Sequence, residues 1–203
     1  MTLSDFHHVF LPGDLEKPVL LLLHGTGGDE HDLIPLVQAV DATAAILSIR
    51  GKVLENGMPR FFRRLSEGVF DLEDLVLRTE ELADFIAVAR QHYGLQQSQL
   101  MVLGFSNGAN IAANMLFQRP EAVDGAMLLR AMVTKPPENL PDLSAKSVLM
   151  LSGLMDPIIP MDNSKALAEF FEKAGADIIF TAKPVTHGLV QSDIQDMKAW
   201  LSK

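Results

Sequence analysis

The chain has 203 residues, a length that fits one domain with a complete hydrophobic core, so we expect a single domain over residues 1–203. Hydrophobic residues make up 48% of the chain and charged residues 21%, which excludes a disordered or fibrous protein. The formal net charge of −9 repels phosphate backbones, so we expect no nucleic-acid partner. The absence of cysteine excludes disulfides, a thiolate nucleophile and a Cys-ligated metal.

The first residues give no sign of export or of membrane insertion. Residues 1–5 lack the basic segment and long apolar run of a secretory signal, so we expect a cytoplasmic protein. The apolar stretch at residues 19–23 is far shorter than the roughly 20 residues that span a bilayer. It predicts a buried strand.

Short apolar runs recur along the chain, and each is bounded by Gly, Pro, Ser or a charged residue. The four clearest are residues 18–23, 44–49, 100–103 and 148–151. Such near-continuous runs are typical of strands in a parallel sheet that is covered on both faces. Weaker candidates are residues 123–129 and 178–181, and residues 7–11 are predicted to form an edge strand.

Helical patterns lie between these runs. The clearest is residues 71–93, with further helices expected at 164–173 and 189–201. Seven apolar residues of the first helix recur at helical spacing and should face the sheet: Leu72, Leu75, Val76, Leu82, Ala83, Ile86 and Ala89. The alternation of strands and helices predicts a doubly wound, mostly parallel α/β sheet.

Two segments interrupt the alternation, residues 51–68 and the proline-rich residues 134–146. Both are predicted to be loops. In an open α/β sheet, ligands bind beyond the carboxyl ends of the strands, where such connections gather. We therefore expect both segments to form walls of a substrate site.

Gly104-Phe105-Ser106-Asn107-Gly108 follows a predicted strand and precedes a small-residue helix at 109–117. This is the context of a nucleophile elbow, a strained turn that exposes a serine and needs glycines to avoid clashes. The alternative is a glycine-rich turn without chemistry. The context favours Ser106 as a nucleophile.

A serine nucleophile needs a histidine base and an acid, in the chain order serine, acid, histidine. His187 is the only histidine after Ser106. The candidate acids include Asp142, Asp156, Asp162 and Asp177, and we favour Asp156 because it alone comes immediately after a buried strand. Two alternatives stay open: Asp156 could form a turn before Pro157, and Asp162 could be the acid or a helix N-cap.

His24-Gly25-Thr26-Gly27-Gly28 begins where the strand at 18–23 ends. An oxyanion hole on such a sheet takes one main-chain N–H from this loop and one from the residue after the nucleophile, which predicts Thr26 and Asn107. His24 precedes the elbow and is expected to brace the loop.

The other glycine and histidine patterns give no cofactor site. Glu30 occupies the place of the third glycine of a dinucleotide fingerprint, and no phosphate-loop motif occurs. The remaining histidines show no metal-ligand spacing: His7, His8, His31 and His92. We expect no cofactor and no metal.

Together, the motifs at residues 24–28, 104–108, 153–160 and 186–188 closely resemble the phospholipase/carboxylesterase family of small α/β-hydrolases. This family includes acyl-protein thioesterases and bacterial carboxylesterases. The resemblance runs from about residue 19 to residue 201, and residues 50–51 and 58–64 resemble the bacterial branch related to proteins of quinone and electrophile stress regulons. It implies an α/β-hydrolase fold in a single domain without a large lid.

The resemblance also implies a serine hydrolase that cleaves carboxylic esters of small or short-chain acyl groups through an acyl-enzyme. An acyl thioesterase, a lysophospholipase or a peptidase would use the same nucleophile, and a non-catalytic ligand-binding homologue is the alternative from another class. Asn107 stands where acyl-protein thioesterases typically have Gln, which weakens a claim to their protein substrates. Family members often pair, so a homodimer stays open.

Arg60, Arg63 and Arg64 form the one basic cluster of this acidic chain. They could steer an anionic acyl group toward Ser106. They could instead pair with Glu55, Glu67 or Asp71 on a solvated loop, which is the simpler hypothesis because surface ion pairs are common.

Overall fold

A seven-stranded sheet runs through the molecule in this computed structural model, which describes residues 1–66 and 68–202. The strand order is β1-β3-β2-β8-β9-β10-β11, and only β1, at one edge, runs antiparallel to its neighbour. The strands are β1 (His8–Leu11), β2 (Val19–Leu23), β3 (Ile46–Ile49), β8 (Leu100–Phe105), β9 (Gly125–Leu129), β10 (Ser147–Gly153) and β11 (Asp177–Lys183). The mostly parallel α/β fold expected from the sequence is confirmed.

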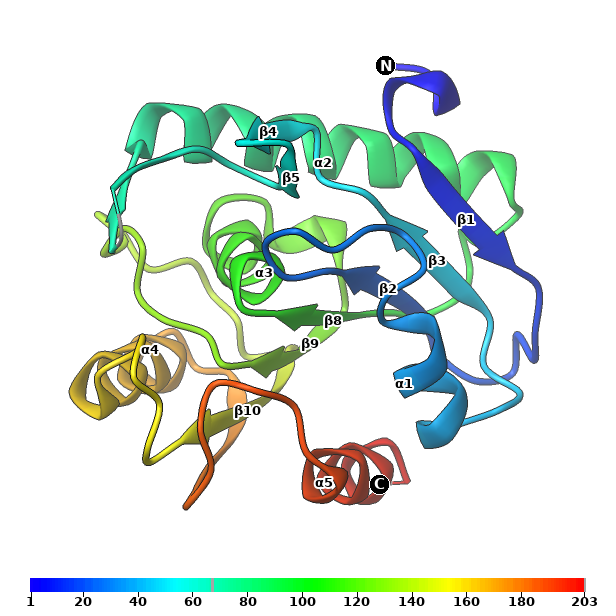
Figure 1. The fold of residues 1–203 in the computed structure, drawn as a ribbon. Coiled ribbons are helices and arrows are strands. Elements are labelled where there is room, and N and C mark those ends of the chain that lie inside the picture. Colours follow the sequence, from blue (N-terminus) through cyan, green and yellow to red (C-terminus); the bar gives the residue numbers. More distant parts are fainter. Residues whose placement is uncertain (67, 203) are drawn as a thin grey trace.

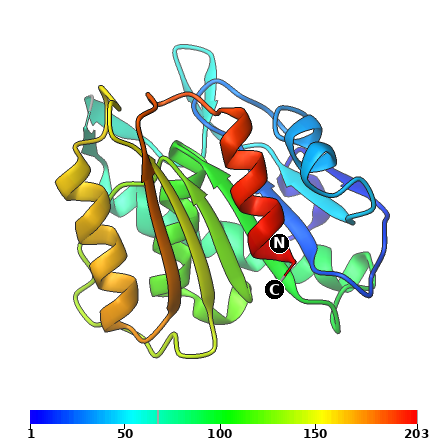
Figure 2. The same cartoon turned by 90° about the horizontal axis from the view of Figure 1, so that it is seen from below.

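Helices cover both faces of this sheet. They are α1 (Ile34–Val40), α2 (Leu72–His92), α3 (Asn107–Gln118), α4 (Met161–Lys173) and α5 (Gln191–Leu201), with short 3-10 turns at Leu3–Asp5 and Pro120–Ala122. Helices α2, α3 and α4 share one apolar core with the sheet, whereas α1 and α5 share the core on the other face. Figure 1 shows α2 and α3 above the sheet and α1 and α5 below it. Seen from below, α5 crosses in front of the strands (Figure 2).

Strand β2 explains why the apolar runs of the sequence are continuous rather than alternating. Successive side chains of a strand point to opposite faces. Leu21 and Leu23 pack in the core between the sheet and helices α2 and α3. Leu20 and Leu22 pack in the core between the sheet and helices α1 and α5. All of them are buried, so every position of this central strand must be apolar.

The longest helix, α2, agrees with the sequence prediction except that neither Leu72 nor Val76 belongs to the apolar core. The side chain of Asp71 caps the helix by accepting the N–H of Asp74, and Gly94 follows the end of the helix with φ of 71°. Leu72 is 41% exposed, and Val76 is only partly buried, so the prediction that these two face the sheet is wrong. The short helix α1 was not predicted from the sequence, since seven residues with Pro35 carry little periodic signal.

The prediction that residues 51–68 form a loop is wrong. The segment folds into two hairpins, β4 (Val53–Glu55) with β5 (Met58–Arg60), and β6 (Arg64–Ser66) with β7 (Val69–Phe70). The first hairpin turns at Asn56-Gly57, where both residues have positive φ, and this dipeptide is a strong hairpin signal. Residues 134–146 contain no helix or strand, as expected.

Helix α3 packs directly against the sheet, and small residues allow this approach. A Cβ atom on Gly108 would overlap the carbonyl group of Leu23 at the end of β2, which is backbone that cannot rotate away. Ala109, Ala112 and Ala113 are also buried against the core. The contact holds the start of α3 against the end of β2.

We expect Gly108→Ala to lower the free energy of unfolding by about 1–3 kcal/mol, because the added methyl group forces two buried backbones apart. Urea denaturation measures this change. Gly188→Ala is the matched control, since a Cβ there meets no atom within 4 Å, and it should change stability by less than about 0.5 kcal/mol. Equal effects in the two variants would contradict the close-contact explanation.

Candidate active site

Ser106 occupies the turn between β8 and α3 in a conformation that few residues other than glycine adopt. Its φ and ψ are 52° and −113°. Its N–H donates to the carbonyl of Leu129 at 2.9 Å, and a Cβ on Gly104 would overlap the backbone of Ala109. The neighbouring elements therefore hold the strained turn, and the serine side chain lines a cavity.

A chain of two hydrogen bonds joins Ser106 to the other residues singled out from the sequence. Ser106 Oγ lies 2.9 Å from His187 Nε2, and His187 Nδ1 lies 2.7 Å from Asp156 Oδ2. The carboxylate only accepts, so Nδ1 carries the imidazole proton and Nε2 accepts from the serine hydroxyl. The other oxygen of Asp156 accepts the N–H groups of Ile158 and Ile159, which fixes the carboxylate.

The structure separates Asp156 from the other candidate acids. Its side chain is only 2% exposed beneath the imidazole, whereas the side chain of Asp162 is 99% exposed in the first turn of α4. Asp142 accepts the N–H of Ser144. Asp177 is the first residue of β11, whereas His187 follows the last residue of that strand. Of the four, among the described residues, only Asp156 contacts His187.

Thr26 and Asn107 line the same cavity as Ser106 and His187. Within the described part of the chain, neither of their main-chain N–H groups donates a hydrogen bond, so both are free for a ligand. The loop that carries Thr26 is tied to the first hairpin, because the N–H of Gly27 donates to the carbonyl of Pro59 at 2.9 Å. This arrangement can hold an oxyanion by main-chain donors.

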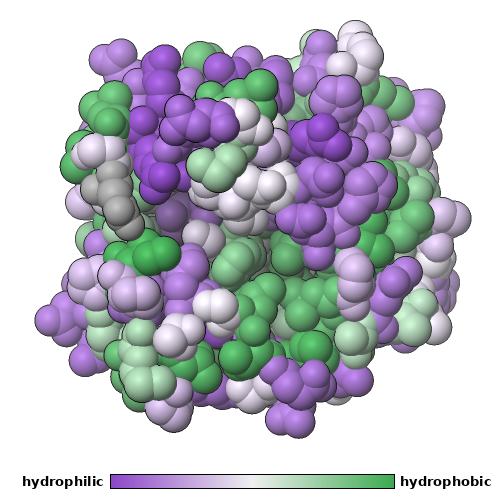
Figure 3. Space-filling model, viewed as in Figure 1, coloured by the Kyte–Doolittle hydropathy of each residue, from purple (hydrophilic) through white to green (hydrophobic). Residues whose placement is uncertain are grey.

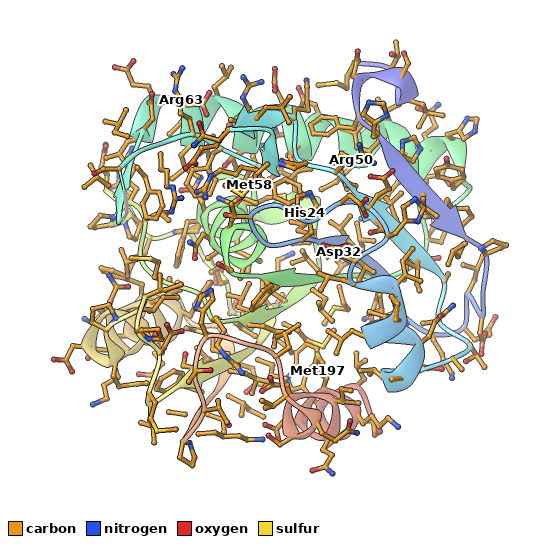
Figure 4. The ribbon with its side chains drawn as sticks, viewed as in Figure 1. His24, Asp32, Arg50, Met58, Arg63 and Met197 are labelled. Carbon is orange, nitrogen blue, oxygen red and sulfur yellow. The ribbon has the colours of Figure 1, made fainter. Side chains whose placement is uncertain are left out.

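His24 braces this loop from beneath and is 1% exposed. Its Nε2 accepts the N–H of Gly51 at 2.9 Å, so Nδ1 carries the proton and donates to the carbonyl of Gly25 at 2.6 Å. Burial lowers the pKa of His24 from its ordinary value of 6.5. The neutral ring, near the centre of the view in Figure 4, thus joins the oxyanion loop to the end of β3.

Arg130 is a site residue that the sequence analysis missed. It follows β9 with φ of 55° and is 1% exposed. Its five N–H groups all donate: two to the carboxylate of Asp193, and the others to the carbonyls of Leu151, Thr186 and Gly188. Thr186 and Gly188 flank His187, so Arg130 holds the histidine loop. The available signal was a charged residue directly after an apolar strand.

The basic cluster is divided between the cavity and the surface. Arg63 pairs with Asp71 and its side chain is 60% exposed, as the pairing hypothesis expected, and Figure 4 shows it at the edge of the molecule, apart from His24. Arg60 and Arg64 both pair with Glu55 and line the cavity. Glu67, the other expected partner, lies outside the described residues.

Arg60 is the buried member of this cluster. Burial lowers the pKa of its guanidinium, the charge of Arg64 lowers it further, and Glu55 acts in the opposite direction. An arginine in such surroundings still keeps its charge at neutral pH. A permanent positive charge therefore lies beside Thr26, whose hydroxyl accepts from Arg60 Nη1 at 2.6 Å.

The cavity beside Ser106 has a volume of about 270 Å³. The segment 51–68 contributes Arg60, Arg64 and Gly68 to its wall, as expected. Residues 134–146 do not line it, so that prediction is wrong: the segment lies against α3 and α4, and Ile158 and Ile159 complete the wall instead. Figure 3 shows hydrophilic side chains above and hydrophobic side chains gathered below the centre of this view.

The model of the phospholipase/carboxylesterase family matches residues 5–203. The chain belongs to this family. It is therefore a hydrolase of the carboxylesterase type with the α/β-hydrolase fold, and the expected family is confirmed.

Relatives within the family share most of their length with this chain. "Putative hydrolase MhqD" of Bacillus subtilis strain 168 is 42% identical over 193 residues, 95% of this chain and 96% of the relative. The carboxylesterase structure from Bacillus cereus is 46% identical with a TM-score of 0.94, covering 97% of this chain and 93% of that one. The structure of YahD with malic acid is 31% identical with a TM-score of 0.91, covering 97% and 98%. The match to the bacterial carboxylesterase branch is confirmed.

Two further properties follow from the described residues. No group of three or more His, Asp or Glu side chains in residues 1–66 and 68–202 is placed to hold a metal ion. Over the same residues, every helix is too short or too polar to cross a bilayer.

We expect Arg130→Met to lower the free energy of unfolding by about 3–5 kcal/mol, because Asp193 would stay buried without its partner. The double variant Arg130→Met/Asp193→Leu should recover much of this loss, since it removes both charges. Ester hydrolysis should stay low in the double variant, because the carbonyls of Thr186 and Gly188 have still lost the hydrogen bonds from Arg130. Urea denaturation and ester hydrolysis measure the two effects, and full activity in the double variant would contradict the role of Arg130 in holding His187.

Proposed function

We propose that the protein is a serine hydrolase that cleaves carboxylic esters of small or short-chain acyl groups. Ser106 is the nucleophile, His187 the general base and Asp156 the acid that orients the imidazole. The observation that carries this proposal is the pair of hydrogen bonds from Ser106 Oγ to His187 Nε2, 2.9 Å, and from His187 Nδ1 to Asp156 Oδ2, 2.7 Å. Membership of the carboxylesterase family supports it.

In the first half of the reaction, His187 Nε2 takes the hydroxyl proton as Ser106 Oγ attacks the ester carbonyl carbon. The carbonyl oxygen becomes an oxyanion, and the main-chain N–H groups of Thr26 and Asn107 stabilise it. The imidazolium, held by Asp156, then gives its proton to the departing alkoxide. The products are an alcohol and an acyl group bound to Ser106.

In the second half, water replaces the alcohol. His187 takes a proton from the water, which attacks the acyl carbonyl carbon, and returns the proton to Ser106 Oγ as the acid departs. Loss of one oxyanion donor typically costs about 100- to 1000-fold in rate. Main-chain donors make this hole insensitive to side-chain replacement.

The size and surroundings of the cavity support small substrates. About 270 Å³ holds a short acyl or alkyl group, and in the described part of the chain only two small hairpins come between β3 and α2. Malic acid, with which the relative YahD was solved, is a ligand of this size class. The cytoplasmic location, the single domain over residues 1–203, the lack of a nucleic-acid partner and a homodimer stay predictions.

We expect Asp156→Asn to fold normally and to lose most of its esterase turnover, because an amide cannot stabilise the imidazolium. Asp162→Asn is the matched control, since its side chain is 99% exposed, and it should keep normal activity. The measurement is the hydrolysis of p-nitrophenyl butyrate. Near-normal activity of Asp156→Asn would move the acid to another residue.

Covalent labelling tests the nucleophile and separates an enzyme from a non-catalytic ligand-binding homologue. A fluorophosphonate probe should label the wild type, and Ser106→Ala should abolish both labelling and hydrolysis. Labelling that survives in Ser106→Ala would contradict the assignment. Acyl thioesters and lysophospholipids assayed beside the ester compare the remaining substrate classes.

A second expected outcome concerns chain length. The kcat/KM for p-nitrophenyl esters should be highest for acyl groups of about two to six carbons and should fall for longer chains, because a cavity of about 270 Å³ cannot enclose them. A series from acetate to palmitate, with an emulsified triglyceride as the comparison, measures this. A preference for the triglyceride would contradict a small-substrate site.

A further inference from the structure

The cavity beside Ser106 has two chemically different walls. One wall is apolar and comes from Met132, Ile158 and Ile159. The other, basic wall carries Arg60 and Arg64. Among the described residues, no carboxylate lines the cavity, so its only permanent charges are positive.

Arg60 keeps one end of its guanidinium free. Its Nη1 donates to Thr26 Oγ1 at 2.6 Å, and its Nε donates to the carbonyl of Phe62 at 3.2 Å and lies 3.3 Å from a Glu55 oxygen. Its Nη2 makes no hydrogen bond within the described part of the chain, although the residue is only 3% exposed. This Nη2 is not among the buried side-chain atoms that lack a partner, so it keeps accessible surface and can donate to a ligand in the cavity.

Arg64 stands beside it and shares the same counter-ion. Its Nε and Nη2 lie 2.8–3.1 Å from the carboxylate of Glu55. A single carboxylate therefore serves two guanidinium groups, and within residues 1–66 and 68–202 one positive charge at the cavity stays without a partner. This local charge is opposite in sign to the net charge of the chain.

Two asparagines of the cavity lining use their side-chain oxygens within the protein. Asn107 Oδ1 accepts the N–H of Phe61 at 2.7 Å, and Asn110 Oδ1 accepts the N–H of Met132 at 2.9 Å. These bonds fix which end of each amide is oxygen and leave the two N–H₂ groups for other partners. Asn107 Nδ2 is buried without a partner among the described residues. Among the described residues that line the cavity, Asn110 therefore adds a side-chain N–H₂ donor to those of Arg60 and Arg64.

We propose that this wall binds a carboxylate, and that the preferred substrates are esters that carry a free carboxylate a few carbons from the scissile carbonyl. A carboxylate only accepts hydrogen bonds, and it matches a guanidinium in both charge and geometry. The apolar wall receives the rest of the ester. The inference rests on the proposed function, since it names the substrate class of the same Ser106 site.

Two matched pairs of esters test this, each differing only by a carboxylate in place of a terminal methyl group. Monoethyl glutarate against ethyl valerate places the charge on the acyl side, and O-butyrylglycolate against ethyl butyrate places it on the alcohol side. The measurement is kcat/KM by acid release at constant pH. We expect the anionic ester to be preferred about tenfold or more in at least one pair.

Variants of the Arg64–Glu55 ion pair should change this preference in opposite directions. Arg64→Gln should lower the ratio of anionic to neutral kcat/KM about tenfold, and Glu55→Gln should raise it. Arg63→Gln is the matched control, because it removes the same charge from the same segment but lies outside the cavity, paired with Asp71. It should change the ratio by less than about twofold, since exposed charges are well screened.

A measurement on the wild type alone keeps the test valid if a variant fails to fold. Valerate should inhibit the hydrolysis of ethyl butyrate competitively and more strongly than its neutral amide, valeramide, does. The inference is overturned if neither anionic ester is preferred, if Arg63→Gln and Arg64→Gln have equal effects, or if valerate and valeramide inhibit alike. If Ser106→Ala abolishes hydrolysis of the neutral esters in any of these cases, the proposed function stands and only the carboxylate site is rejected.

Discussion

At the carboxyl end of β2, the backbone of Leu23 lies directly against Gly108 at the start of α3, and the candidate site is built around this contact. Leu23 leads into the loop that carries Thr26, and Gly108 follows the turn that carries Ser106. The absence of a side chain at Gly108 therefore sets how near the proposed nucleophile comes to the proposed oxyanion donors. Close packing, rather than any single hydrogen bond, determines this spacing.

Buried polar side chains hold the loops that packing leaves free. His24 ties the oxyanion loop to the segment after β3, and Arg130 ties the histidine loop to β9 and α5. Each is almost fully buried with its hydrogen-bonding groups satisfied, the condition under which buried polar groups specify one arrangement instead of weakening the core. The residues proposed to act on substrate thus depend on residues that never touch it.

The basic wall differs from these bracing residues because its donors are not all used within the protein. The guanidinium of Arg60 and the amide of Asn107 are as deeply buried as His24 and Arg130, yet each keeps donors without a partner among the described residues. The free nitrogen of Arg60 keeps accessible surface, so a ligand that supplies an acceptor can bind it. The proposed preference for anionic esters thus depends on positive groups gathered at one place of an acidic chain.

The sequence by itself determined the layers of the fold and the residues of the proposed triad. Continuous apolar strands can be satisfied only by a sheet buried on both faces, and the order of Ser106, Asp156 and His187 relative to strand ends places all three at one edge. The Asn56-Gly57 turn carried a local signal for the first hairpin, which the loop prediction overlooked. Only the tertiary structure revealed Arg130, separated buried Arg60 from exposed Arg63, and excluded residues 134–146 from the cavity wall. Burial and partners at these positions come from segments distant in the chain, so no local pattern encodes them.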